Sequence, residues 1–286
     1  MRITRTVGII SLMMLTFWAT PMKLSAAPDV RGWDRLVDKL VEHGLERDHV
    51  ETIFSDPKMP AYELVAFQLK PAEPSRIYSY FFKPRTIALA KTELQNYAEW
   101  FQSAEETYEV PREVIAGILL IETQFGRITG KRMVLGRLSR LANIGQADNI
   151  NFNFKRHHAN NKKVKREEVE ARAQYLEDLF FPEVKALFEI AEERAIDIFG
   201  IVGSSAGAFG IPQFLPYSMQ RFGVDANQNG QVSLFEMPDA IHSTANFLKQ
   251  HGWVTKTKKT HKKAIYFYNR SDAYVNAVLT VASKVK

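Results

Sequence analysis

A single acidic side chain, Glu122, ends an apolar run in the stretch AGILLIETQFGRITG, residues 116–130. If a helix starts at Pro111, positions 111, 115, 118, 122 and 125 share one face, and Glu122 is the one charged residue on it. Gly126 fits the end of this helix, which places the carboxyl group in the last turn. Burial and the negative end of the helix dipole would then both raise the pKa of Glu122. A carboxyl group that keeps its proton near neutral pH can act as a general acid.

Two ordinary roles compete with this chemistry. Glu122 could pair with a buried arginine or lysine, or its side chain could reach solvent past the end of the helix. The apolar periodicity by itself favours these roles over catalysis, so a catalytic interpretation depends on the rest of the chain.

A second group of residues has the spacing of metal ligands. The segment DANQNGQVSLFE, residues 225–236, fits the twelve-residue EF-hand loop, with a glycine for the sharp turn at position 6 and a valine at the apolar position 8. Calcium would be held by Asp225, Asn227, Asn229, Gln231 (through its backbone carbonyl), Ser233 and Glu236. Only two of these side chains are charged, which predicts weak binding suited to the high calcium concentration outside a cell. The alternative is an Asn/Gly-rich turn without a metal, and a lone loop favours a structural staple over a switch.

Helices would have to position both groups of residues. Apolar residues recur at helical spacing over most of the chain, and little of it alternates as a strand would. We expect helices within residues 34–54 (divided at Gly44), 87–110, 111–125 and 169–199, and on both sides of the loop 225–236. Residues 57–86 contain five prolines and predict an extended segment that wraps over another surface. Residues 200–216, GIVGSSAGAFGIPQFLP, predict a Gly/Ser-rich loop.

The tract DNINFNFKRHHANNKKVKREE, residues 148–168, is polar and basic. We expect a solvated, mobile loop here, and the alternative is a contact with a carboxylate-rich polymer. The adjacent His157 and His158 cannot share a helix face and have no further ligands at metal spacing, so we expect no metal site in this tract.

The N-terminus and the composition limit the class of protein. MRITR, the uncharged TVGIISLMMLTFWAT and then KLSAAPD are typical of a secretory signal peptide, residues 1–26, whereas residues 6–22 are short for the alternative, an uncleaved anchor. The absence of cysteine excludes disulfides, thiol chemistry and a lipoprotein anchor. The formal charge of +6 falls to +3 without the signal, which holds Arg2, Arg5 and Lys23, and no nucleic-acid motif is present. We expect an exported, periplasmic monomer that binds no nucleic acid and has no stable membrane anchor after signal cleavage.

Six blocks of sequence, in order, resemble the B-type membrane-bound lytic murein transglycosylases and their soluble relatives. The blocks are AEPSRIYSYF (72–81), VIAGILLIETQFGRITGK (114–131), GSSAGAFGIPQFLP (203–216), the loop 225–236, PDAIHSTANFLKQHGW (238–253) and YNRSDAYVNAVL (268–279). The resemblance covers roughly residues 70–285.

The resemblance implies a mainly α fold: a lysozyme-like helical core with a groove for glycan strands, an embedded EF-hand-like calcium loop and an N-terminal helical extension. In this division residues 27–110 wrap the core, and residues 111–286 form it. The glutamate of the block matching IETQFG is the catalytic acid/base of the family, which is Glu122 here. The matching blocks also imply substrate contacts, some of which could orient Glu122, by Ser204, Gln213, Tyr268, Asn269, Tyr274 and Tyr78.

The chain departs from the family pattern at a few positions. Gln124 and Phe125 stand where relatives often have Arg and Trp, and Phe247 stands where a Tyr is common, which removes a hydroxyl group from the groove wall. Residues 150–168 resemble an insertion. None of these departures touches Glu122.

The implied function is cleavage of the β-1,4 bond between N-acetylmuramic acid (MurNAc) and N-acetylglucosamine (GlcNAc) in peptidoglycan, leaving 1,6-anhydromuramic acid ends. Most glycosidases use two carboxylates, but the blocks offer one, which fits a route assisted by the N-acetyl group of the sugar with Glu122 as acid and then base. Calcium would be structural, and no organic cofactor is implied. Two alternatives stay open: a hydrolytic muramidase of the same fold, and a non-catalytic, calcium-stabilised peptidoglycan-binding protein, which would not need a buried acid.

Overall fold

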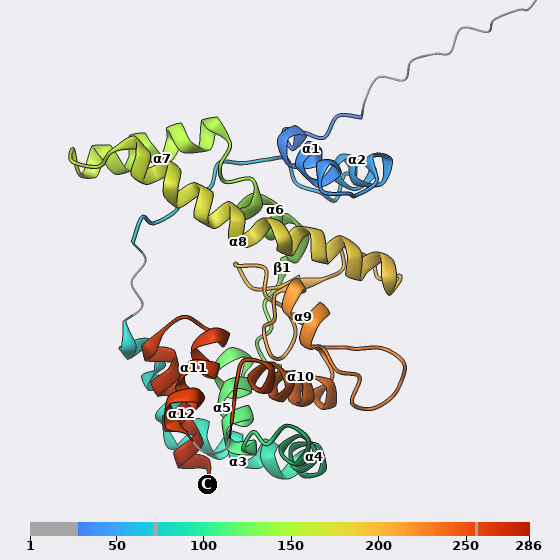
Figure 1. Ribbon diagram of the computed structural model, residues 1–286, viewed down its shortest axis with the longest axis vertical. Coiled ribbons are helices and arrows are strands. Elements are labelled where there is room, and N and C mark those ends of the chain that lie inside the picture. Colours follow the sequence, from blue (N-terminus) through green and yellow to red (C-terminus); the bar gives the residue numbers. More distant parts are fainter. Residues whose placement is uncertain (1–27, 71–73, 255–256) are drawn as a thin grey trace, which may run out of the picture.

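The computed structural model describes residues 28–70, 74–254 and 257–286, which fold mostly into helices (Figure 1). The expected mainly α fold is confirmed: the strands of the described ranges are the short β1 (Arg132–Met133) and β2 (Val202–Gly203), which pair antiparallel. The expected signal peptide, residues 1–26, lies outside the described residues. None of the helices in these ranges has the length and apolar character needed to cross a membrane.

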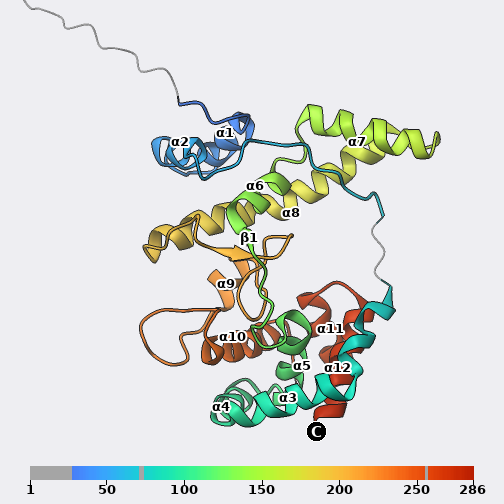
Figure 2. The same cartoon turned by 180° about the vertical axis from the view of Figure 1, so that it is seen from behind.

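The helices form two groups, which we name after their central members. The α8 lobe comprises α1 (Asp34–Glu42), α2 (Arg47–Ser55), α6 (Val134–Ala142), α7 (Ala147–Asn160) and α8 (Arg166–Glu193). The α5 lobe comprises the 3-10 helix η1 (Ser75–Phe82), α3 (Pro84–Asn96), α4 (Ala98–Tyr108), α5 (Arg112–Thr123), α10 (Met237–Gln250), α11 (Lys258–Tyr268) and α12 (Asp272–Val285). Figures 1 and 2 show the lobes one above the other, with β1, β2 and α9 (Pro216–Phe222) between them. Since α9 contacts both α8 and α10, it couples the two lobes.

Helix α5 is the centre of its lobe. It contacts α3, α4, α10, α12 and η1, and every residue from Val114 to Ile121 is buried. A helix that is apolar on all sides is expected only where other elements surround it. The helix begins one residue later than predicted, because Pro111 is its N-cap, and it ends before Gly126: Gln124 and Phe125 already have left-handed backbone angles, with φ of 52° and 57°.

Helix α8 crosses the width of its lobe, with α6 and α7 packed on it (Figure 2). Glu177, near its middle, is buried and accepts hydrogen bonds from Arg35 Nη2 at 2.8 Å and Lys39 Nζ at 2.6 Å, both on α1. A buried carboxylate requires such partners because its desolvation is costly. This cluster therefore ties α1 to α8.

The prediction of a mobile loop at residues 148–168 is wrong, because α7 and the start of α8 cover most of it. Asn149 and Asn153 are fully buried in α7 and bond the backbone of a distant segment: Val65 N–H donates to Asn149 Oδ1 at 2.7 Å, and Phe67 N–H donates to Asn153 Oδ1 at 3.0 Å. The asparagines thus satisfy buried backbone groups that would otherwise lack partners. Their low intrinsic preference for helices is overridden by this tertiary role.

The proline-rich segment 57–86 has two parts. Residues 60–68 contain no helix or strand and lie along α7, where Phe67 packs with Val169 and Leu176 of α8. Residues 75–82 form η1 instead of continuing an extended path. The helix predicted at residues 87–110 is two helices, α3 and α4, that meet at Tyr97.

The Gly/Ser-rich loop 200–216 is held against the chain that follows α5. β2 pairs with β1, and the two segments approach so closely that a Cβ atom on Gly130 would lie 2.1 Å from the carbonyl oxygen of Gly203. Only a glycine fits at such a distance. The close approach brings the loop to the end of α5, where Glu122 lies.

Candidate functional site

Glu122 is half-buried in the last turn of α5, as expected, and its partner is a tyrosine from α12. The hydroxyl group of Tyr274 donates a hydrogen bond of 2.5 Å to Glu122 Oε1. Tyr274 lies in the first turn of α12, where the side chain of the N-cap residue Ser271 accepts a hydrogen bond from its backbone N–H at 3.2 Å. The capped helix end therefore sets the position of the phenol.

Two further tyrosines pack around this pair. The ring of Tyr78, from η1, meets the ring of Tyr274 edge-on at 5.9 Å, and the ring of Tyr268 stacks parallel to Tyr274 at 6.3 Å. Burial, and then the negative charge of Glu122, raise the pKa of Tyr268 and Tyr274 well above 10. Both phenols therefore keep their protons at neutral pH and act as donors.

Tyr268 and Gln213 brace the loop 200–216. The Tyr268 hydroxyl group donates to the carbonyl oxygen of Pro212 at 2.5 Å. Gln213, whose φ is 52°, donates from Nε2 to Gly210 O at 2.8 Å and to Thr129 O at 3.2 Å. The amide nitrogen expected to orient Glu122 or the substrate thus holds the loop against the segment after α5.

Ser204 also supports the loop 200–216, whereas Asn269 lies at the end of a helix. Ser204 Oγ accepts hydrogen bonds from the backbone N–H groups of Ala208 at 3.1 Å and Ala206 at 3.3 Å, so it shapes its own loop. Asn269 is half-buried and is the C-cap of α11, directly after Tyr268. Of the residues predicted to form the site, the contacts join Glu122, Tyr274, Tyr268 and Tyr78 into one cluster, and place Gln213 and Ser204 in the supporting loop.

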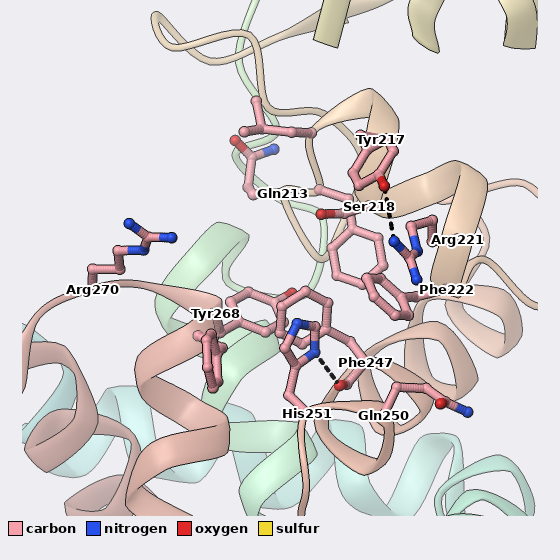
Figure 3. Close-up of a pocket in the computed structure, with 13 residues that line it drawn as sticks. Gln213, Tyr217, Ser218, Arg221, Phe222, Phe247, Gln250, His251, Tyr268 and Arg270 are labelled. Carbon is pink, nitrogen blue, oxygen red and sulfur yellow. Dashed lines mark hydrogen bonds between the residues drawn. The ribbon is translucent and has the colours of Figure 1, made fainter. Parts of the chain in front are cut away.

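A cavity of about 420 Å³ opens beside this cluster (Figure 3). We call it the aromatic pocket; its lining residues are Gln213, Phe214, Leu215, Tyr217, Ser218, Arg221, Phe222, Phe247, Gln250, His251, Phe267, Tyr268 and Arg270. Phe247 stacks on His251 at 4.0 Å and meets Tyr268 edge-on at 4.9 Å. Tyr268 lines the pocket and stacks on the Tyr274 ring that binds Glu122, so the pocket is connected to the acid through two aromatic rings.

Several residues of the pocket were not predicted from the sequence. Tyr217 and Arg221 are four residues apart on α9, and Arg221 Nη1 donates to the Tyr217 hydroxyl oxygen at 2.8 Å (Figure 3). This i, i+4 spacing is the one local signal that could have identified them. His251 and Arg270 belong to helix ends, and only the packing of α10 and α11 brings them to the cavity.

The loop 225–236 joins α9 to α10 and brings together oxygen-bearing side chains from the predicted positions. Asp225 accepts hydrogen bonds from the backbone N–H groups of Asn229 at 3.1 Å and Gly230 at 2.8 Å. Glu236 Oε2 accepts from Asn227 Nδ2 at 2.6 Å and Asn229 Nδ2 at 3.3 Å, so the two amides and this carboxylate meet inside the loop. The position-6 glycine has the expected left-handed angle, with φ of 89°.

The donor set fits calcium, which prefers carboxylate, amide and carbonyl oxygens. One contributor to the loop lies outside the twelve-residue pattern and was missed. Asp239, fully buried in the first turn of α10, accepts hydrogen bonds from the backbone N–H groups of Ser233 at 2.7 Å and Ala226 at 2.9 Å. Asp239 thus fixes the ends of the loop that would carry the ligands.

Comparisons with known proteins support a family assignment. A model of the "Transglycosylase SLT domain" family matches residues 29–262. The chain is 29% identical over 233 residues to membrane-bound lytic murein transglycosylase B of Escherichia coli K12, a match that covers 77% of this chain and 57% of that protein. The chain thus spans somewhat over half the length of this curated relative.

Solved structures share the fold. Escherichia coli lytic transglycosylase Slt35 in complex with calcium superposes with a TM-score of 0.65 at 23% identity, over 88% of this chain and 92% of that one. SltB3 of Pseudomonas aeruginosa in complex with NAG-anhNAM-pentapeptide superposes with a TM-score of 0.63 at 17% identity, over 88% and 78%. These likenesses confirm the lysozyme-like helical fold expected from the sequence. Because the family model covers most of the chain, including the N-terminal helices from residue 29 that the six blocks left out, this protein belongs to the transglycosylase SLT domain family, in its B-type branch.

Proposed function

We propose that the protein is a lytic transglycosylase that cleaves the β-1,4 bond between MurNAc and GlcNAc in peptidoglycan and leaves 1,6-anhydromuramic acid ends. The observation that carries this proposal is the hydrogen bond from the buried Tyr274 to Glu122. A carboxyl group with a fixed donor, next to a cavity lined with aromatic rings, suits acid–base chemistry on a sugar. The murein transglycosylase relatives and the complex of SltB3 with NAG-anhNAM-pentapeptide agree with this substrate class.

In the proposed reaction Glu122 acts first as an acid and then as a base. It donates its proton to the glycosidic oxygen as the bond from that oxygen to C1 breaks, and the carbonyl oxygen of the sugar's own N-acetyl group meets the positive charge that develops at C1. The Glu122 carboxylate then takes the proton from the C6 hydroxyl group, whose oxygen attacks C1 and closes the anhydro ring. Glu122 ends the cycle protonated, and no water is consumed.

The neighbouring residues position this acid and the sugar. Tyr274 fixes the rotation of the carboxyl group, because its own phenol is held in the first turn of α12. Tyr268 and Gln213 hold the loop 200–216 at the site through their bonds to Pro212 and Gly210. We assign Tyr78, Ser204 and Asn269 to the groove wall by the resemblance of their blocks.

One experiment distinguishes this proposal from its two alternatives. Purified sacculi are digested with the protein, and the masses of the products are measured by mass spectrometry. We expect anhydro ends; a hydrolytic muramidase of the same fold would give ends heavier by one water. Intact sacculi would contradict both enzymes and favour a non-catalytic binding protein.

We also propose that the loop 225–236 holds calcium in a structural role. Asp225, Asn227, Asn229, Ser233 and Glu236 would supply side-chain oxygens, and Gln231 its backbone carbonyl. The supporting observations are the convergence of Asn227, Asn229 and Glu236 and the solved calcium complex of Slt35. A bound ion would link α9, which carries part of the aromatic pocket, to α10. The proposed setting is the periplasm, where the substrate lies and calcium reaches a weak site.

A further inference from the structure

The aromatic pocket has an unbalanced charge. Its lining includes the cations Arg221 and Arg270 together with His251, and none of the lining residues is an aspartate or a glutamate. Within the described part of the chain neither arginine takes part in an ion pair, although other arginines, such as Arg35 and Arg127, do. Two guanidinium groups without a carboxylate partner face the same cavity (Figure 3).

Arg221 is held in place by aromatic side chains. Its Nη1 donates to the Tyr217 hydroxyl oxygen at 2.8 Å, and the guanidinium carbon lies 5.4 Å from the centre of the Tyr217 ring and 5.8 Å from that of Phe222. These contacts orient the guanidinium group but neutralise none of its charge. Most of its five N–H donors stay available for a ligand.

Arg270 stands on the opposite side of the pocket from Arg221 (Figure 3). It follows Tyr268 and Asn269 in the turn between α11 and α12, directly before the residue that caps α12. The end of α11 and the start of α12 thus fix its backbone, and its exposed side chain can reach into the mouth of the cavity.

The floor between the two arginines is aromatic. Phe247 contacts both Tyr268 and Phe222 there, with its ring centre 4.9 Å from that of Tyr268 and 5.0 Å from that of Phe222. Flat aromatic faces suit the apolar faces of sugar rings, and free guanidinium groups suit carboxylates, which they bind through paired hydrogen bonds. The ligand that matches both features is a sugar that carries a carboxylate.

We propose that the aromatic pocket is a subsite for a carboxylate borne by the glycan strand, with Arg221 and Arg270 as the residues that select it. This inference rests on the proposed function, because the strand is taken to continue from Glu122 across Tyr268 into the pocket. In peptidoglycan the carboxylate has two possible sources. It is the lactyl group of a MurNAc without a peptide, or it belongs to the stem peptide of a substituted MurNAc.

Binding to the E122Q protein tests the subsite without depending on cleavage. The probes are a GlcNAc tetramer, which has no carboxylate, a GlcNAc–MurNAc tetramer with free lactyl groups, and the same tetramer with pentapeptides, each titrated by calorimetry. We expect at least one acidic probe to bind about tenfold or more tightly than the neutral one. In the R221Q/R270Q variant on the E122Q background we expect this preference to disappear, with the affinity for the neutral tetramer unchanged. Loss of preference for the lactyl probe, the peptide probe or both identifies the source.

A matched variant removes the same charge elsewhere. Arg85 and Lys91 are exposed on α3, outside the pocket, so R85Q/K91Q changes the net charge equally. An unchanged ratio of affinities in R221Q/R270Q, or an equal loss in R85Q/K91Q, would overturn the proposal. The single variants R221Q and R270Q, each checked by its melting temperature, give the same test if the double variant does not fold. Failure of the proposed function is seen separately, as intact sacculi with the wild-type protein.

Discussion

The hydroxyl group of Tyr274 lies 2.5 Å from Glu122 Oε1, although 152 residues separate the two along the chain. Tyr274 is almost completely buried, with 1% of its surface exposed, so its phenol is not free to swing away. Each group constrains the other: the charge of Glu122 helps to raise the pKa of Tyr274, and the protonated phenol fixes the carboxyl group.

Replacing Glu122 by Gln removes the proton that the reaction needs while keeping an oxygen that can accept the hydrogen bond from Tyr274. We expect the rate of glycan cleavage to fall by about a thousandfold, because general acid–base catalysis contributes on that scale. The melting temperature should change little. Release of soluble fragments from sacculi measures the rate, and substantial cleavage by E122Q would contradict the assignment of Glu122.

Replacing Tyr274 by Phe keeps the buried ring and removes the hydroxyl group. We expect kcat to fall by about ten- to a hundredfold and KM to stay within about twofold, because the loss affects the orientation of Glu122 more than it affects the binding of the strand. The matched control is Y266F, since Tyr266 is exposed on α11 and should tolerate the same change. Equal kcat values for Y274F and the wild type would remove Tyr274 from the site.

Removing calcium should destabilise the protein more than it alters the chemistry. With a chelator we expect the melting temperature to fall on the order of 5 °C, because an ion that binds only the folded state stabilises it by mass action. D225N/E236Q should melt lower than the wild type without chelator and show no further response to it. D178N changes an exposed carboxylate on α8 and should respond as the wild type does. If the melting temperature of the wild type did not change on addition of the chelator, this result would contradict the calcium site.

Glu183 predicts a dependence of stability on pH. This residue of α8 is 8% exposed, and burial raises the pKa of its carboxyl group from 4.5 to about 7, although the Tyr217 N–H donates to it at 2.8 Å. Between pH 4.5 and 7 the folded protein therefore binds more protons than the unfolded chain, and stability falls as the pH rises through this window. Above pH 7 the ionised group costs on the order of 3 kcal/mol. We expect E183Q, which keeps an acceptor for Tyr217, to be more stable than the wild type at pH 8 and similar to it at pH 4.5, by urea unfolding.

Glu177, six residues earlier on the same helix, should behave in the opposite sense. Burial acts to raise its pKa, but the hydrogen bonds from Arg35 and Lys39 outweigh it and lower the pKa below 4.5. Its ionised form therefore stabilises the fold above that pH and is lost only in more acidic solution. E177Q should destabilise the protein at pH 8, where E183Q stabilises it. The same pH response in both variants would contradict these assignments.

The sequence predicted the features that local spacing encodes. Glu122 lies at the end of an apolar helix, as the periodicity predicted. The proposed calcium ligands of the loop 225–236 were identified by their fixed spacing, and Asn227, Asn229 and Glu236 of this set contact one another. The split at Tyr97 and the left-handed Gln124 were not visible, because no proline or glycine marks either position.

Features that depend on distant contacts could not be predicted. Asn149 and Asn153 read as loop residues because their partners are backbone groups 84 to 88 residues away. In the sequence Arg270 does not differ from an ordinary turn residue. It lines the pocket only because α9 and α10 supply the other walls. Tyr274 was predicted to be a sugar contact, and its bond to Glu122 appears only when α12 lies against α5.

The place of α12 in the chain has a consequence for biosynthesis. This helix follows every other element of the described chain, yet it supplies the phenol that holds the acid and packs on both α5 and η1. Contacts of such long range form late, since a large loop must close first. A chain that has not yet been synthesised through α12 therefore has no assembled site, and the proposed glycan cleavage can begin only after this helix docks on α5.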